Sequence, residues 1–438
     1  MRWPALAAAL LFGAAPGSAA PVLMISVDGL RPADVIEAEK IGLSVPTLKH
    51  MMSAGAYAEG VTGVLPTLTY PSHTTLITGA APARHGVGSN LTFDPTNVNQ
   101  IGWDWYAEDI KVPTLWSAAR AAGLVTANVH WPVSVGAPAD YNLPQIWRTG
   151  HEDDRKLMRA LATPGLLDSL QAKLGPYSQG IDESVEADEN RVRFAAALIA
   201  DKKPAFTTVY LASVDHNEHA FGPGSPEALA TIARNDAMIG RLVAAARAAQ
   251  PDLTVVVVSD HGFQTLTTDV NLIAPFIAAG LITLDADGKV KDWLAEPWIM
   301  GGTAGVVLKR LDDPALVARV AGLLAKLKAD PDMAIADVLD AQAVARMGGS
   351  PMCSFLIAFR PGFEPGHDPR AAKQVPSTYQ GMHGYLAAAP AMRSSLFVDG
   401  PGISRHGDLG QIDMRSIAPS VARVLGVRLG GAEAQPVF

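Results

Sequence analysis

The chain has 438 residues, of which 48% are hydrophobic and 18% are charged, so it can form one large α/β domain with insertions or two to three smaller domains. This balance excludes a disordered or acidic-tail protein. Its 43 acidic and 35 basic side chains give a formal net charge of −8, which argues against binding to a nucleic-acid backbone. A single cysteine, Cys353, excludes an internal disulfide framework and any multi-cysteine metal site, and we expect a buried, inert thiol.

The first twenty residues have the three parts of a secretory signal. Met1-Arg2 supplies a positive start, residues 4–15 are apolar, and small residues end at Ala20. The apolar stretch is shorter than the roughly 20 residues that span a bilayer. We therefore expect cleavage after Ala19 or Ala20 and a periplasmic or secreted protein, residues 21–438, with no membrane span after signal removal. The alternative is an N-terminal hydrophobic helix that stays attached.

Short β-branched or apolar runs alternate with helical patterns, as in a parallel sheet with helices on both faces. Four runs end in or just before an aspartate: residues 22–27, 207–212, 255–259 and 394–398, followed by Asp28, Asp215, Asp260 and Asp399. Ala-rich helical patterns cover residues 191–200 and 226–249. Ligands of open α/β sheets bind outside the carboxyl ends of the strands, so these aspartates predict one shared site. For Asp399, beside Gly400-Pro401, a cap or turn residue is the simpler interpretation.

Residues 65–79 are predicted to form a loop that enters a short helix closed by Gly79. Thr69 is expected to cap this helix, with Pro71 in the first turn. A helix N-terminus presents free N–H groups to an anion, and a hydroxyl whose pKa is lowered there by a divalent metal becomes a nucleophile toward a bound phosphate. The alternative is a plain capping threonine.

Further motifs follow in a fixed order over nearly the whole chain. The full series is Val27-Asp28-Gly29-Leu30-Arg31, residues 66–79, His85-Gly86-Val87-Gly88-Ser89-Asn90 with Asp94-Pro95, Trp131-Pro132, Asp215-x-x-x-His219 with Gly222-Pro223, Ser259-Asp260-His261-Gly262, and Met382-His383-Gly384-Tyr385. In these motifs the chain resembles the nucleotide pyrophosphatase/phosphodiesterase branch of the alkaline phosphatase superfamily. The resemblance implies an α/β fold, an alkaline-phosphatase-like three-layer sandwich with a mostly parallel central sheet plus a cap insertion. We expect a single domain with insertions at roughly 135–190 and 270–380.

The same resemblance implies two Zn²⁺ ions per chain, bridged by the reacting phosphate. One ion would be held by Asp28, Thr69, Asp260 and His261, and the other by Asp215, His219 and His383. Carboxylate oxygens and imidazole nitrogens independently suit zinc, and the four-residue spacing of Asp215 and His219 places both on one face of a helix. Thr69 is implied as the nucleophile, and Asn90 as a donor to a non-bridging phosphate oxygen.

Aromatic residues are the candidates for the substrate pocket. Tyr70 follows the nucleophile where the family has an aromatic that stacks on a nucleobase. Trp131 and Trp147 lie between Asn90 and Asp215, in the stretch expected to form the cap insertion, and Tyr141 is a further candidate. For each aromatic, packing in the core is the alternative.

Other histidines and two departures from the family pattern complete the site prediction. Six histidines match no ligand position and are expected to be structural or surface groups: His50, His130, His151, His216, His367 and His406. His73 and His85 belong to motifs and are expected to orient loops. Glu218 replaces a usual glycine and is expected to face solvent or to hydrogen-bond a ligand histidine. Leu68 replaces a commonly basic or polar residue.

The implied reaction is hydrolysis of a phosphodiester or pyrophosphate bond in a small-molecule substrate such as a nucleotide. It would proceed through a phosphothreonine intermediate, with Leu68 and Tyr70 giving apolar contact to the organic group of a diester. The alternative is a phosphomonoesterase of the same superfamily, for which Arg155-Lys156 would supply a basic pair. A sulfatase is disfavoured by the nucleophile region, and a non-catalytic binding protein is a third interpretation. The sequence leaves the oligomeric state open.

Overall fold

A computed structural model describes residues 20–98, 102–146, 153–177 and 182–438. Nearly all of the expected signal, together with Trp147 and His151, lies outside the described residues. Among the described residues, no helix has the length and apolar character needed to cross a membrane.

The centre of the molecule is an eight-stranded sheet in the order β19-β2-β18-β7-β1-β6-β4-β5. Its strands are β1 (Val22–Val27), β2 (Ala56–Tyr57), β4 (Thr126–Val129), β5 (Tyr141–Leu143), β6 (Phe206–Leu211), β7 (Thr254–Val258), β18 (Leu396–Asp399) and β19 (Gly407–Asp408). β1 is central and pairs in parallel with both β6 and β7, and β4 and β5 continue the parallel order. The predicted strands are confirmed to within one or two residues.

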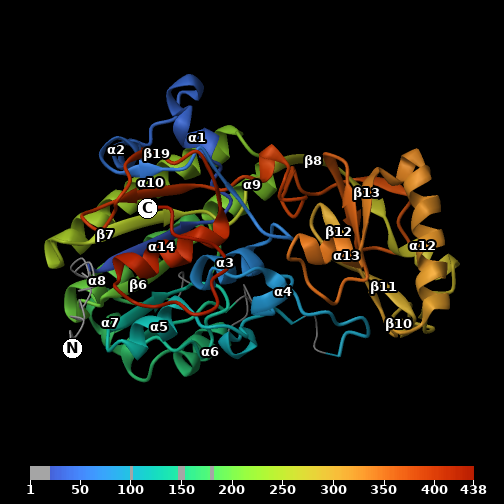
Figure 1. Cartoon of the computed structure of the whole chain (residues 1–438), viewed down its shortest axis with the longest axis horizontal. Helices are drawn as coiled ribbons and strands as arrows, with labels where there is room; N and C mark the ends of the chain where they lie inside the picture. Colours follow the sequence, from blue (N-terminus) through green and yellow to red (C-terminus); the bar gives the residue numbers. More distant parts are fainter. Residues whose placement is uncertain (1–19, 99–101, 147–152, 178–181) are drawn as a thin grey trace, which may run out of the picture.

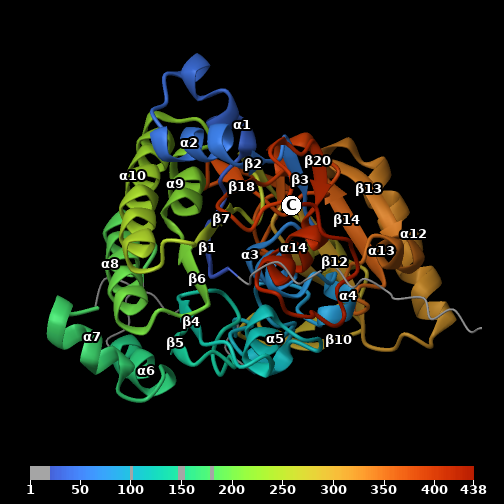
Figure 2. The ribbon, with the colours of Figure 1, turned by 60° about the vertical axis from the view of Figure 1, so that its left-hand side comes forward.

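Helices cover both faces of this sheet. Because successive side chains of a strand point to opposite faces, Leu23, Ile25 and Val27 enter one core, while Val22 and Met24 enter another. The first core is closed by α2 (Pro46–Ala54), α8 (Val185–Lys202) and α10 (Pro226–Ala249), and the second by α3 (Thr69–Thr78), α5 (Leu115–Ala121) and α14 (Ile417–Val424). Figure 2 shows α8 and α10 on one side of β1 and β6, and α14 on the other. The predicted three layers are confirmed.

Residues 264–382 leave the main sheet and form a second lobe, on the right in Figure 1. One of its sheets pairs β8 (Gln264–Asn271) with β15 (Gly362–Gly366), β16 (Gln374–Pro376) and β17 (Gly381–Met382). Another is antiparallel and contains β11 (Ala295–Met300), β12 (Thr303–Leu308), β14 (Phe355–Phe359) and β13 (Ile335–Asp340). Helix α12 (Pro314–Ala329) buries Leu316, Val320 and Leu324 in the hydrophobic core of this second lobe.

The remaining elements connect these layers. They are α1 (Pro32–Ile36), β3 (Gly60–Thr62), α4 (Pro82–His85), α6 (Asp154–Leu161), α7 (Leu166–Leu174), α9 (Ser213–Phe221), α11 (Ile273–Ala278), β9 (Ile282–Leu284), β10 (Val290–Trp293), α13 (Ala341–Arg346) and β20 (Gln411–Asp413). The span 135–190, expected as an insertion, contains α6 and α7 but also β5, which pairs with β4 in the main sheet.

The structure also tests the expectations for Asp399 and Cys353. β18 runs antiparallel to β7, so Asp399 lies opposite Val255 near the amino end of β7, away from the other aspartates, and binds Arg247 at 2.7 Å. The expectation of a fourth aspartate at the shared edge is therefore wrong, and Asp399 ends β18 as the ion-pair partner of Arg247. Cys353 is buried, and burial raises the pKa of its thiol to about 12, as expected for an inert thiol.

Candidate active site

The carboxyl ends of β1 and β7 bring Asp28, Asp260 and His261 together. The two strands are neighbours and parallel, so residues that follow them meet at one edge of the sheet. His261 Nε2 lies 3.3 Å from Asp28 Oδ1 and 3.1 Å from Asp260 Oδ2. The segment around Ala391 packs closely on this main chain, because a Cβ atom at Gly262 would lie 2.1 Å from the Ala391 carbonyl oxygen.

Asp215, His219 and His383 form a second group beside the first. Asp215 and His219 lie one turn apart on α9, with His219 Nε2 3.5 Å from Asp215 Oδ1. His383 follows β17 on the return from the second lobe, and its Nε2 lies 3.6 Å from the same Asp215 oxygen. The His261 and His383 rings stack at 3.7 Å, so the two groups are in contact.

All three histidines use Nδ1 on a backbone carbonyl. His219 Nδ1 donates to Gly381 O at 2.9 Å, His383 Nδ1 to Thr67 O at 3.1 Å, and His261 Nδ1 approaches Gly262 O at 3.3 Å. The bond at Nδ1 fixes the neutral tautomer with a free lone pair on Nε2, the state in which imidazole binds a metal ion. Each Nε2 faces a carboxylate of the site.

Each of the three carboxylates has one solvent-shielded oxygen without a hydrogen-bond partner in the described part of the chain. Asp28 Oδ1, Asp215 Oδ1 and Asp260 Oδ2 have no hydrogen-bond partner among the described residues. Burial, followed by the charge of Asp260, raises the pKa of Asp28 well above its ordinary value, and burial, followed by the charge of Asp28, does the same to the pKa of Asp215. Burial raises the pKa of Asp260 to about 7 and lowers the pKa of His219 to about 4. Divalent cations would relieve this cost.

The side chains form two possible ligand sets, and within each set the donor atoms lie within 4.8 Å of one another. One set is Asp28, Asp260 and His261, and the other is Asp215, His261 and His383. The structure thus brings together all six predicted carboxylate and imidazole ligands. His261 lies close enough to serve either set, whereas the sequence prediction gave His219, not His261, to the second ion. His219 remains within reach of that ion through its contact with Asp215.

Thr69 lies at the start of α3, with its Oγ1 3.5 Å from His261 Nε2. It is the first residue of the helix, and Leu68 occupies the capping position, so the expected capping role of Thr69 is wrong. Fewer backbone N–H groups are free at the start of α3 than expected from the sequence. Tyr70 N donates to Asn90 Oδ1 at 2.8 Å, Ser72 N donates to Leu68 O, and Pro71 has no N–H. Asn90 therefore binds the helix start through its oxygen, which leaves the Nδ2 end for a ligand.

Several predicted pocket residues are packed in the interior. Tyr70 is 1% exposed and its ring lies 5.4 Å from that of Trp103, while Leu68 packs with Leu65 and Trp298. The expected apolar contact of Leu68 and Tyr70 with a substrate is therefore wrong for this conformation. Trp131 is fully buried and donates through Nε1 to His73 O, and Tyr141, half-buried on β5, packs under Lys202.

Glu218 corrects another expectation. It is fully buried, and neither carboxylate oxygen has a hydrogen-bond partner among the described residues, so it neither faces solvent nor bonds a histidine. Its nearest cation is Arg31, whose Nε lies 3.7 Å from Oε1 and which also binds Asp34. Burial raises the pKa of Glu218 well above its ordinary value, and Arg31 opposes that shift.

The sequence prediction missed three side chains around the site. Tyr210, on β6, donates its hydroxyl hydrogen to Asp28 Oδ2. Asp188, on α8, accepts from the N–H groups of Ala212 and Ser213 and so holds the start of α9. Tyr379 is 48% exposed, and its ring lies 4.9 Å from that of His219. None of the three lies inside a recognisable motif, so only the fold could reveal them.

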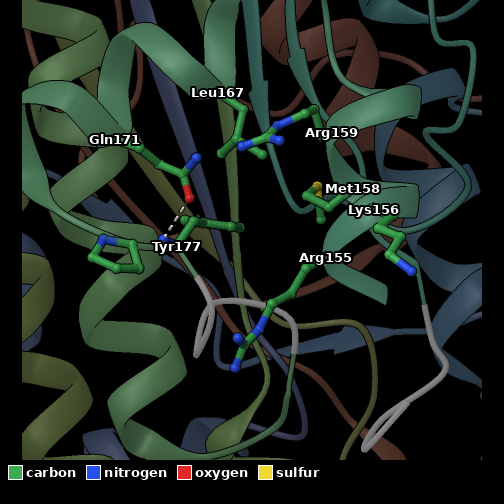
Figure 3. Close-up of a pocket in the computed structure, with 8 residues that line it drawn as sticks. Arg155, Lys156, Met158, Arg159, Leu167, Gln171 and Tyr177 are labelled. Carbon is green, nitrogen blue, oxygen red and sulfur yellow. Dashed lines mark hydrogen bonds between the residues drawn. The ribbon is translucent and has the colours of Figure 1, made fainter. Parts of the chain in front are cut away.

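A separate pocket of about 180 Å³ lies between α6 and α7 (Figure 3). Its lining includes Arg155, Lys156 and Arg159, but none of the predicted metal ligands. Lys156 binds Asp153 and Arg159 binds Asp168, so two of these cations are already paired. The basic pair expected for a monoesterase is therefore not part of the site at the sheet edge.

Comparison with known proteins identifies the family of the chain. The family model described as "Type I phosphodiesterase / nucleotide pyrophosphatase" matches residues 22–386. The chain belongs to this family. Human ectonucleotide pyrophosphatase/phosphodiesterase family member 1 is 26% identical over 256 residues, which are 56% of this chain and 24% of that protein. An uncharacterized pyrophosphatase/phosphodiesterase of Schizosaccharomyces pombe is 28% identical over 58% of this chain and 46% of its own length. The chain thus spans less than half the length of these relatives.

Solved structures of the same family share the fold. Human ectonucleotide pyrophosphatase/phosphodiesterase 5 covers 95% of this chain and 97% of its own, with a TM-score of 0.68 at 19% identity. An inactive threonine-to-alanine variant of the murine protein, in complex with AMP, matches with a TM-score of 0.67 at 18% identity over 96% of this chain and 97% of its own. The predicted alkaline-phosphatase-like architecture is confirmed.

Proposed function

We propose that this family member is an exported two-zinc hydrolase that cleaves phosphodiester or pyrophosphate bonds through a phosphothreonine intermediate on Thr69. The observation that carries the proposal is the cluster of six carboxylate and imidazole side chains, none more than 18% exposed, next to the Thr69 hydroxyl. A group of carboxylates with unpartnered oxygens and histidines with free Nε2 atoms is suited to Zn²⁺ and costly to keep without a cation.

The residues at the carboxyl ends of β1 and β7 would hold one ion, and Asp215, His219 and His383 the other. When bound, the two ions would lower the pKa of the attacking hydroxyl and of a water molecule and would neutralise charge on the phosphate. Asn90, anchored by its oxygen to the start of α3, would donate through Nδ2 to a phosphate oxygen.

The reaction would take place in two displacements. Thr69 Oγ1 forms a bond to phosphorus and loses its proton, while the bond to the leaving oxygen breaks. Water then attacks the phosphothreonine, the Thr69 hydroxyl is regenerated, and the phosphate product leaves. Two in-line displacements give net retention at phosphorus.

A nucleotide is our proposed substrate class, in keeping with the AMP complex of the murine relative. Since Tyr70 is buried, the exposed ring of Tyr379 beside His219 is the better candidate for contact with a base. Export is supported by the pattern of residues 1–20, and N-terminal sequencing of the mature protein would test it.

The decisive experiment compares diesters with a monoester on zinc-loaded protein. We expect bis-p-nitrophenyl phosphate or a nucleoside p-nitrophenyl phosphate to exceed p-nitrophenyl phosphate in kcat/KM by about tenfold or more, because Arg155 and Lys156, the basic pair that would grip a monoester, line a separate pocket. A monoester that is the better substrate would overturn the diesterase assignment. Absence of hydrolysis with every ester would favour a binding protein.

A further inference from the structure

His73 joins three elements of the site through one buried imidazole. It lies on α3 and is fully buried. Its Nε2 lies 2.8 Å from Ser26 Oγ, and its Nδ1 lies 2.7 Å from Thr69 O. The same Nδ1 lies 3.5 Å from Asp260 Oδ2. Ser26 is two residues before Asp28 on β1, so the imidazole links both ligand-bearing strands to the nucleophile.

The hydrogen-bond partners define the tautomer. A carbonyl oxygen only accepts, so His73 Nδ1 must carry the proton that it donates to Thr69 O. His73 Nε2 then accepts from the Ser26 hydroxyl. The same Nδ1–H faces Asp260 Oδ2, which has no hydrogen-bond partner among the described residues and lies 3.1 Å from His261 Nε2.

The ring is also confined by its neighbours. The rings of Trp131 and Tyr210 meet it edge to face, with centroids at 4.9 and 5.0 Å and interplanar angles of 81° and 87°. Because both nitrogens are bonded and two aromatic rings pack against it, the imidazole has little freedom to rotate.

We propose that His73 is a positioning residue that fixes the Thr69 main chain and the Asp260 carboxylate relative to each other. This inference rests on the proposed function, in which Thr69 attacks phosphorus and Asp260 holds an ion. Loss of the Nδ1–H would leave the fold intact but would let the Thr69 hydroxyl move away from its line of attack on phosphorus. A misplacement of about 1 Å can cost about 100-fold in rate.

Two substitutions test the contacts of the two imidazole nitrogens separately. His73→Asn places an amide N–H near the position of Nδ1 and keeps a donor for Thr69 O, whereas His73→Gln reaches toward Ser26 and loses that donor. The matched control is His130→Asn. His130 is equally buried and stacks on the same Tyr210, but its ring nitrogens have no hydrogen-bond partner among the described residues.

The test measures kcat, KM, zinc affinity by chelator competition, and Tm for each variant. We expect His73→Gln to lower kcat about 100-fold with KM little changed, and to weaken zinc binding about tenfold through the lost contact with Asp260. His73→Asn should retain most of kcat. His130→Asn should lower Tm only.

Three outcomes would overturn the inference: wild-type kcat and zinc affinity in His73→Gln, equal loss of kcat in the Asn and Gln variants, or a loss confined to Tm. A wild-type protein that cleaves no ester would instead contradict the proposed function. In that case the zinc affinities still decide whether His73 positions Asp260.

Discussion

The two halves of the candidate site are built in different ways. The strand half, Asp28, Asp260 and His261, follows two neighbouring strands at the centre of the main sheet. The crossover half, Asp215, His219 and His383, combines a helix with the segment that returns from the second lobe. Side chains of the strand half are at most 1% exposed, whereas those of the crossover half are 7–18% exposed.

This difference has an energetic consequence. The strand half is held by the parallel ladders of β1 and β7 and is in place whenever the sheet is formed. The crossover half depends on long-range hydrogen bonds, from His219 to Gly381 O and from His383 to Thr67 O. Regions held by few long-range contacts open more readily than a central sheet, so we expect the crossover half to bind its ion more weakly.

The largest effect should come from Thr69, which lies beside the strand half. Thr69→Ala should lower kcat by about 10³-fold or more, because it removes the covalent route, while Thr69→Ser should keep measurable activity. Thr78→Ala, at the other end of α3, is the control. The assay is hydrolysis of a p-nitrophenyl diester, and a wild-type rate in Thr69→Ala would disprove the mechanism.

Metal removal should distinguish the two halves. We expect a strong chelator to abolish activity and added Zn²⁺ to restore it, with an intermediate stage of one ion per chain as the crossover half empties first. Elemental analysis during stepwise chelation measures this directly. Active protein without a divalent transition metal would contradict the site, and simultaneous loss of both ions would contradict the difference between its halves.

His383→Ala tests the crossover half alone. Because the second lobe carries its own core, the variant should stay folded, keep one ion per chain and lose about 100-fold in kcat. The exposed His50 provides a control, as His50→Ala should leave zinc content and rate unchanged. Full occupancy of both sites in His383→Ala would remove His383 from the ligands.

The smallest effect concerns the accessible edge of the crossover half. Tyr379→Ala should raise KM for a nucleoside p-nitrophenyl phosphate by about fivefold, or about 1 kcal/mol, since base stacking on an exposed ring is worth roughly that amount. KM for bis-p-nitrophenyl phosphate should change less. Tyr106, exposed to a similar extent at 47%, is the control. Equal KM values in wild type and Tyr379→Ala would exclude contact with the base.

Much of the fold could be predicted because the patterns are local. The run of buried residues that ends at Asp28, the helix over 226–249, and the four-residue spacing of Asp215 and His219 each depend on neighbours in the chain. The exposure of pocket residues depends instead on distant segments. Tyr70 was expected to meet substrate, but Trp103 and the Val87 and Val133 side chains cover it.

Glu218 shows the same limit in a charged residue. Its sequence context, on an amphipathic helix next to a ligand, is compatible with solvent exposure, and only the packing of α9 beside Arg31 buries it. The direction of β18 is another example, because the antiparallel pairing that removes Asp399 from the site is a property of the sheet.

The sequence by itself determined the parallel α/β architecture and the aspartates that follow its strands, because those patterns are local, while the motifs that resemble the family supplied the other metal-ligand candidates and the threonine. Tertiary structure alone decided how His383 meets Asp215, that His261 lies close enough to serve either ligand set, and which aromatic rings stay exposed. Those relations join residues that are far apart in the chain, and they arise only when the second lobe and the helices pack against the edge of the sheet.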